Sequence, residues 1–123
     1  MQDPKKLKVR GEALKLAVAA YRLTAAFPTS ERFGLASQMQ RAAVSVGSNI
    51  SEGCGGHGDR AMIAYLHHAI GSLNELEFQV EIAIELMYGT ADLSLTLQSQ
   101  LNTVRRMAIG LVTTLRRRSV PDV

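Results

Sequence analysis

Hydrophobic residues recur every three or four positions along most of the chain, which is the spacing of one face of an α-helix. The pattern predicts four helices, at about 9–27, 31–52, 59–87 and 91–117. No segment shows the period-two alternation that is typical of a strand. Four long helical segments with short connections predict an all-α, up-down-up-down four-helix bundle, with residues 1–123 as a single domain.

The helix ends are predicted from local signals. Pro28 should end the first helix, because the residue before a proline is pushed out of the α conformation. We expect Thr29 or Ser30 to cap the second helix and Asp59 to cap the third. The glycine-rich stretch 53–58 predicts a loop, and Gly89-Thr90 predicts a helix stop followed by a new cap.

Polar residues form a second row at helical spacing inside the second and third helical segments. The row contains Gln38, Arg41, Ser45, Asn49 and Glu52, and then Ser72, Glu75 and Gln79. Polar groups that face a core need hydrogen-bond partners. We therefore expect a structural polar network between the two helices. Its expected members are Gln38, Arg41, Ser45, Asn49, Ser72 and Glu75.

In an antiparallel hairpin about the glycine loop, Arg41 should lie near Ser72, and Gln38 near Glu75. An Arg–carboxylate pair with amide and hydroxyl neighbours would fix the register of the two helices. A ligand or catalytic pocket along the same row is the alternative interpretation.

The composition is that of a globular domain with an aliphatic core. Hydrophobic residues make up 46% and charged residues 20% of the 123 positions. The single cysteine, Cys54, excludes a disulfide within the chain and favours a reducing compartment. No apolar run approaches the roughly 18–20 residues that span a bilayer. We expect a cytoplasmic protein with no membrane partner.

The charges are distributed unevenly, although the net charge is only +3. Basic residues gather near both chain ends, and none lies between positions 61 and 104. An up-down bundle would bring the chain start, the glycine loop with Arg60, and the chain end together. We therefore take the terminal cations as candidate nucleic-acid-binding residues. They are Lys5, Lys6, Lys8, Arg10, Arg116, Arg117 and Arg118.

Two further readings of these cations stay open. Cations at the end of the last helix also complement its dipole, which is a purely structural role. The second reading is that Lys5, Lys6 and Lys8 form an ordinary solubilising terminus. No aromatic residue is interleaved with the cations, so base stacking is not expected.

Signs of catalysis or of a metal site are weak. No glutamate has a histidine three residues later, as a di-iron bundle requires. Cys54 and His57 offer two ligands, whereas a structural zinc site needs four. His67 and His68 are adjacent and would point about 100° apart on a helix. The glycine loop lacks the Gly-Lys-Ser/Thr ending of a phosphate-binding loop. We predict no catalytic residue, no metal and no cofactor.

Apolar residues also lie outside the expected core rows. The extra residues are Leu14, Ala17, Val18, Tyr21 and Ala25 in the first helix, and Leu93, Leu95, Ile109 and Val112 in the last. An exposed apolar stripe on a globular protein marks an interface, so we expect a homo-oligomer.

A multi-residue pattern over positions 27–75 identifies a family resemblance. The residues that carry it are Phe27-Pro28, Glu31-Arg32-Phe33-Gly34-Leu35, Gln38, Arg41-Ala42-Ala43, Ser45, Asn49-Ile50, Glu52-Gly53, Ala69, Gly71-Ser72-Leu73 and Glu75. The pattern resembles the bacterial four-helix-bundle proteins first met as products of intervening sequences in large-subunit ribosomal RNA genes. Those proteins are similar to the accessory variability determinant of diversity-generating retroelements.

The resemblance implies a cytosolic bundle that assembles as a barrel-like homopentamer, and for most of the family no biochemical activity is established. The retroelement relatives imply binding to nucleic acid and to a reverse transcriptase. The chain departs from the family in the glycine loop, where Cys54-Gly55-Gly56 and a lone Arg60 stand in place of an aromatic and more basic residues.

Together these observations predict a non-enzymatic homo-oligomeric scaffold or accessory protein that binds RNA or DNA, or a ribonucleoprotein, through its basic end. A protein–protein assembly without nucleic-acid binding is the alternative. A small-molecule or metal enzyme in the polar row is less favoured.

Overall fold

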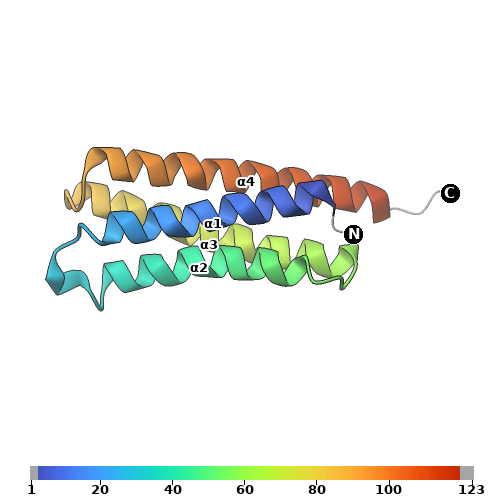
Figure 1. The fold of residues 1–123 in the computed structure, drawn as a ribbon, viewed down its shortest axis with the longest axis horizontal. Coiled ribbons are helices and arrows are strands. Elements are labelled where there is room, and N and C mark those ends of the chain that lie inside the picture. The colour runs from blue at the N-terminus through green and yellow to red at the C-terminus, as the bar shows by residue number, and fades with distance from the viewer. Residues whose placement is uncertain (1–2, 120–123) are drawn as a thin grey trace.

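The computed structural model describes residues 3–119, without the side chain of Ser119, and shows four helices that run antiparallel to their chain neighbours (Figure 1). The helices are α1 (Pro4–Thr24), α2 (Leu35–Gly53), α3 (Asp59–Glu85) and α4 (Ala91–Ser119), with a short 3₁₀ turn at Thr29–Glu31. No strand occurs in this part of the chain, so the predicted all-α, four-helix architecture is confirmed.

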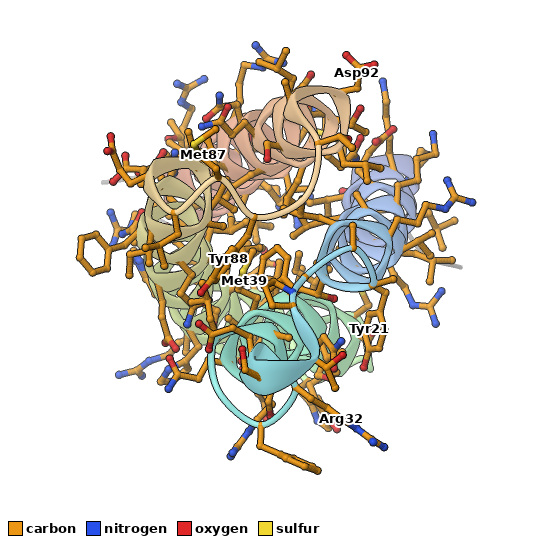
Figure 2. The ribbon with its side chains drawn as sticks, turned by 90° about the vertical axis from the view of Figure 1, so that its left-hand side faces the viewer. Tyr21, Arg32, Met39, Met87, Tyr88 and Asp92 are labelled. Atoms are coloured by element: carbon orange, nitrogen blue, oxygen red, sulfur yellow. The ribbon has the colours of Figure 1, made fainter. Side chains whose placement is uncertain are left out.

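The helices stand at the corners of a square when the bundle is viewed along its axis (Figure 2). Helix α1 contacts α2 and α4, and α3 contacts the same two helices. Helices α1 and α3 therefore occupy opposite corners.

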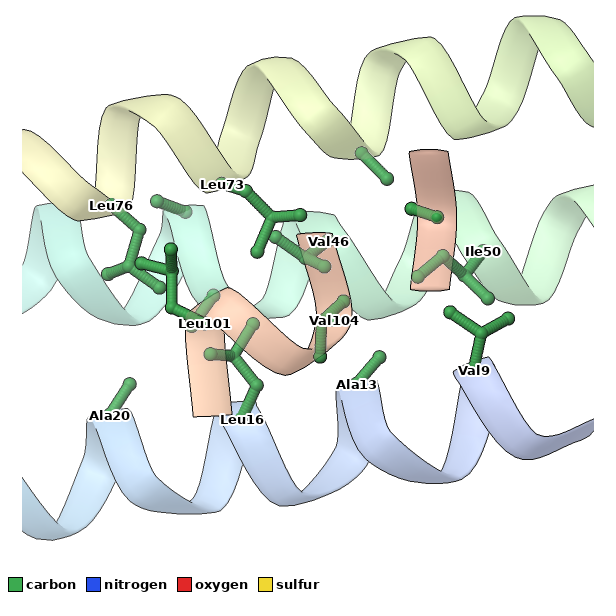
Figure 3. Packing of buried hydrophobic residues seen from close by; sticks show 14 of the residues in the cluster. Val9, Ala13, Leu16, Ala20, Val46, Ile50, Leu73, Leu76, Leu101 and Val104 are labelled. Carbon is green, nitrogen blue, oxygen red and sulfur yellow. The ribbon is translucent and has the colours of Figure 1, made fainter. Parts of the chain in front are cut away.

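The core is aliphatic, as expected for a chain with few aromatic residues. Each helix contributes buried side chains to one cluster, and Figure 3 shows Leu16 of α1, Val46 of α2, Leu73 of α3 and Leu101 of α4 directed toward one another. All four are 1% exposed or less. Burying such a side chain stabilises the fold by roughly 1.5–3 kcal/mol relative to leaving it in water.

Helix α1 begins earlier and ends earlier than predicted. Its first residue is Pro4, because Asp3 caps the helix and its Oδ1 accepts from the Lys5 amide at 2.9 Å. A proline at the first helical position is favourable since its missing N–H has no partner there. The helix ends at Thr24 rather than at Phe27. Phe27 instead packs its ring against Tyr88, with the ring centroids 5.3 Å apart.

Helix α2 begins at Leu35, and the prediction that it starts at Glu31 is wrong. Gly34 interrupts the chain with φ −108° and ψ −116°, which is not helical. Glu31 lies in the preceding 3₁₀ turn, and its Oε1 accepts a hydrogen bond at 3.3 Å from the amide of Leu35, the first residue of α2. The expected cap by Thr29 or Ser30 is not formed in the described chain.

The two remaining connections follow the predicted breakers with local differences. In the glycine loop, Gly58 takes φ +91° and precedes α3, so Asp59 is the first residue of that helix and not its cap. Helix α3 ends at Glu85 rather than at Met87, whose φ is +58°. The predicted cap of α4 is confirmed, since the Thr90 hydroxyl accepts from the Leu93 amide at 3.2 Å.

Candidate functional site

Three basic segments meet at one end of the bundle, which we call the basic end (Figure 1). They are the start of α1, the start of α3 just after the glycine loop, and the end of α4. Their cations are Lys5, Lys6, Lys8, Arg10, Arg60, Arg116, Arg117 and Arg118, all exposed except the half-buried Lys6. The structure therefore brings the sequence-predicted candidates together with Arg60, as the up-down topology implies.

The Arg118 guanidinium is paired with two carboxylates of the same chain. Its Nη2 and Nε lie 2.9 and 3.1 Å from the two oxygens of Asp59, and its Nη1 lies 3.8 Å from Asp3. The hydrogen bond from Arg118 lowers the pKa of the Asp59 carboxyl. Arg118 thus ties the end of α4 to the starts of α3 and α1, and part of the basic end is neutralised within the fold.

Two other arginines of the basic end also have partners inside the molecule. The Arg116 Nη2 lies 2.8 Å from the His67 Nε2, and the Arg10 Nε donates to the Ser51 hydroxyl at 3.2 Å. The remaining cations make no side-chain hydrogen bond or ion pair within residues 3–119. These cations are Lys5, Lys6, Lys8, Arg60 and Arg117.

Cys54 lies beneath the basic end and is 9% exposed. Its thiol lies 3.8 Å from the Lys6 carbonyl, to which it donates a weak hydrogen bond. Burial raises the pKa of the Cys54 thiol. At neutral pH the group is therefore a protonated thiol, which is a poor nucleophile.

The polar row forms hydrogen bonds at the junction of α2 and α3. The hydroxyls of Ser45 and Ser72 are 2.9 Å apart, and the Asn49 amide donates to the Ser45 carbonyl at 2.9 Å. Gln38, Arg41 and Glu75 line the same open hollow, whose volume is about 380 Å³. Arg41 and Ser72, which were expected to lie near each other, both line this hollow, and Ser72 forms its hydrogen bond with Ser45.

The expectation that this row faces the core is wrong for three of its members, whereas Gln79 is buried. Gln38, Arg41 and Glu75 are exposed. No ion pair joins Arg41 and Glu75 in the described chain, and Glu75 instead accepts from Gln79 at 3.3 Å. Consecutive helical residues point about 100° apart. Because Val46 occupies the core, its neighbour Ser45 lies at the edge of the α2–α3 junction.

A comparison with models of known protein families finds a match for this chain. The model of the 23S rRNA-intervening sequence protein family matches residues 5–110. The chain belongs to this family. The family resemblance predicted from residues 27–75 is thereby confirmed, whereas the likeness to the retroelement accessory protein stays a prediction.

A solved structure shares the fold of this family member. It is a protein of unknown function from the S23 ribosomal protein family of Bacteroides thetaiotaomicron, 23% identical, with a TM-score of 0.80. The match covers 89% of the present chain and 98% of the other. A comparison with curated protein sequences finds no match.

Other kinds of site find little support in this member of the family. Within residues 3–119, no three His, Cys, Asp or Glu side chains converge as metal ligands. None of the described helices is both long and apolar enough to cross a bilayer.

The outer apolar surface of this family member differs in part from the expected one. Leu14, Val18 and Tyr21 on α1 and Leu95 and Ile109 on α4 are exposed. Val112, which was expected outside the core, is 5% exposed and packs inside, and Leu93 is half-buried.

An apolar patch over the end of α3 and the residue that follows it was not predicted from the sequence. It contains Phe78 and Leu86, both exposed, with the half-buried Ile82 between them. Their spacing of four residues, outside the core row of Leu73 and Val80, is the sequence signal that could have found it.

Proposed function

We propose that the protein is a non-enzymatic, homo-oligomeric accessory protein that binds the phosphates of nucleic acid through its basic end. The observation that carries the proposal is the meeting of three cationic segments at one end of the bundle. Five of their cations, Lys5, Lys6, Lys8, Arg60 and Arg117, form no side-chain hydrogen bond or ion pair within residues 3–119.

Self-assembly would multiply this charge. Exposed apolar residues on α1 and α3 support assembly, since contiguous patches of this kind mark interfaces. A ring of like-oriented copies, of which the family resemblance implies five, would repeat the basic end around one rim. Such a field attracts nucleic-acid phosphates at long range, and the attraction weakens with salt.

The protein–protein alternative rests on the same apolar patches. In that case the assembly binds protein alone, and the retroelement likeness implies a reverse transcriptase as one such partner. The two functions differ in their response to nuclease. A complex held through nucleic acid falls apart after nuclease treatment, and a protein-only complex persists.

The nucleic-acid proposal is tested by fluorescence anisotropy with double-stranded RNA and DNA across a salt series. The test variant removes three unpaired cations from the basic end, Lys5→Gln, Lys8→Gln and Arg117→Gln. The matched control removes three exposed cations elsewhere, Arg32→Gln, Arg41→Gln and Arg106→Gln. If each lost cation is one phosphate contact, the slope of log K against log salt becomes shallower by roughly 2–3 in the test variant.

The control variant should retain most of the wild-type slope. Wild-type protein that binds neither nucleic acid at low salt would overturn the proposal. Equal losses in the two triple variants would also overturn it, because binding would then follow net charge and not the basic end.

A further inference from the structure

The open hollow of about 380 Å³ at the junction of α2 and α3 is lined mainly by polar side chains, and we call it the polar hollow. Its lining residues are Gln38, Arg41, Ala42 and Ser45 of α2 and Ser72 and Glu75 of α3. Its volume lies within the range of roughly 300–1,000 Å³ that is typical of small-molecule sites. All of its lining side chains except Ala42 carry hydrogen-bonding groups, so the hollow suits a small polar molecule.

Opposite charges line the two walls of the polar hollow. Ser45 and Ser72, whose hydroxyls are 2.9 Å apart, fix how the two helices are aligned. Arg41 precedes Ser45 by about one turn of α2, and Glu75 follows Ser72 by about one turn of α3. Because the two helices run antiparallel, Arg41 and Glu75 lie on the same side of the serine pair and on opposite walls (Figure 1).

Neither charge of the polar hollow is neutralised by an ion pair within the chain. The Arg41 guanidinium makes no hydrogen bond or ion pair within residues 3–119. Glu75 forms no ion pair there either, and its Oε1 accepts a hydrogen bond from the Gln79 Nε2 at 3.3 Å. The N–H groups of Arg41 and the second carboxylate oxygen of Glu75 can therefore bind a ligand.

A buried amide holds Glu75 at the polar hollow. Gln79 is 5% exposed, and its Oε1 has no hydrogen-bond partner in the described chain. A buried acceptor without a partner lowers stability, and an aliphatic side chain would avoid this cost. The neighbouring core residues Leu76 and Val80 are of that kind. The amide is therefore better explained by its contact with the Glu75 carboxylate than by core packing.

The serine pair supplies a further hydrogen-bond donor. The contact between Ser45 and Ser72 uses only one of the two hydroxyl protons, whichever residue donates. The other hydroxyl keeps its proton at the edge of the hollow. A guanidinium with a neighbouring hydroxyl suits a carboxylate, which accepts hydrogen bonds through both of its oxygens. On the opposite wall, the Glu75 carboxylate suits an ammonium group.

We propose that the polar hollow binds a free α-amino acid, with the ligand carboxylate on Arg41 and the serine pair and the ligand ammonium on Glu75. One carbon atom carries both charged groups of such a ligand, so the long side chains of Arg41 and Glu75 can contact it from either wall. A simple anion would be repelled by Glu75, and a simple cation by Arg41. The hollow lies near the middle of α2 and α3, so this inference is separate from nucleic-acid binding at the basic end.

A comparison of three ligands tests whether both charges are required. L-Alanine is a sufficient probe, because the proposed contacts are made to the main-chain groups of the amino acid alone. Propionate lacks its ammonium group, and ethylamine lacks its carboxylate. In ligand-detected NMR titrations, L-alanine should bind at least about tenfold more tightly than either analogue, since each analogue loses charge-assisted hydrogen bonds. Absence of L-alanine binding at millimolar concentrations, or equal binding of propionate, would overturn the proposal.

Single substitutions locate the site. Arg41→Gln and Glu75→Gln should each weaken L-alanine binding by about tenfold or more, with circular dichroism confirming that each variant is folded. The matched controls, Arg106→Gln and Glu81→Gln, change exposed residues outside the hollow and should bind like the wild type. Equal weakening in the test and control variants would contradict the assignment, because binding would then follow net charge.

Gln79→Leu distinguishes positioning of Glu75 from a role in packing. The variant should weaken L-alanine binding, because Glu75 loses its hydrogen bond, and it should not lower Tm, because the unpartnered acceptor is removed as well. A lower Tm with unchanged L-alanine binding would refute the positioning role. If the wild type binds no L-alanine and Arg41→Gln lowers the oligomeric mass, the polar row is a contact between protein chains and the proposal is wrong.

Discussion

The interior residues of the bundle and the polar row at the edge of α2 and α3 recur at the same helical spacing, but they differ in burial. The interior residues, such as Met39, Val46 and Leu73, are fully buried and belong to one hydrophobic cluster. The polar row stands about 100° away around the same helices, where Ser45 and Ser72 meet and Arg41 is exposed. Equal spacing therefore tells which residues share a face, but not how far that face is turned from the core.

Because the interior residues are buried, a substitution there should cause the largest loss of stability. Leu73→Ala removes buried methyl groups and leaves a cavity, which should lower the free energy of unfolding by about 2–5 kcal/mol. Thermal denaturation should show Tm lower by roughly 10 °C or more. Leu95→Ala, at a side chain that is 62% exposed on α4, is the matched control and should change stability by less than about 0.5 kcal/mol. Equal losses would show that Leu73 is not part of a packed core.

The same difference explains how much the sequence could predict. The four helices and their antiparallel order follow from hydrophobic period and glycine loops, which are local signals. The start of α2 was missed because Gly34 and the 3₁₀ turn at Thr29–Glu31 break an otherwise helical composition. Such a break depends on the path that the chain takes between two packed helices, and not on propensity alone.

The candidate site was predictable in part. The basic end follows from topology, since antiparallel helices bring residues near 5, 60 and 117 together. The pairing of Arg118 with Asp59 was not predicted, because it depends on the reach of one side chain across two helices. The prediction of an Arg41–Glu75 ion pair was wrong for a related reason. Both residues lie on the expected side, but a partly solvated edge does not force opposite charges to meet.

An intermediate effect is expected at the side-chain hydrogen bond that joins α2 and α3 across the polar row. Ser72→Ala removes the hydroxyl that meets Ser45 at 2.9 Å, and should lower the free energy of unfolding by about 1 kcal/mol. The double variant Ser45→Ala with Ser72→Ala should lose little more than either single variant, since both changes remove the same hydrogen bond. Fully additive losses in chemical denaturation would show that the two hydroxyls do not stabilise each other. Ser48→Ala, exposed on α2, is the control.

The smallest effect is expected at Arg41. Its guanidinium makes no hydrogen bond or ion pair in the described chain, and alanine is at least as good a helix former. Arg41→Ala should therefore change the free energy of unfolding by less than about 0.5 kcal/mol. Arg105→Ala provides the contrast, because Arg105 donates to Glu77 at 2.9 Å and to Asn74 at 3.0 Å. That variant should lose up to about 1 kcal/mol, the upper range for a partly exposed pair. A larger loss at Arg41, removed by Glu75→Gln, would instead show that the polar row closes its ion pair in solution and specifies the α2–α3 register.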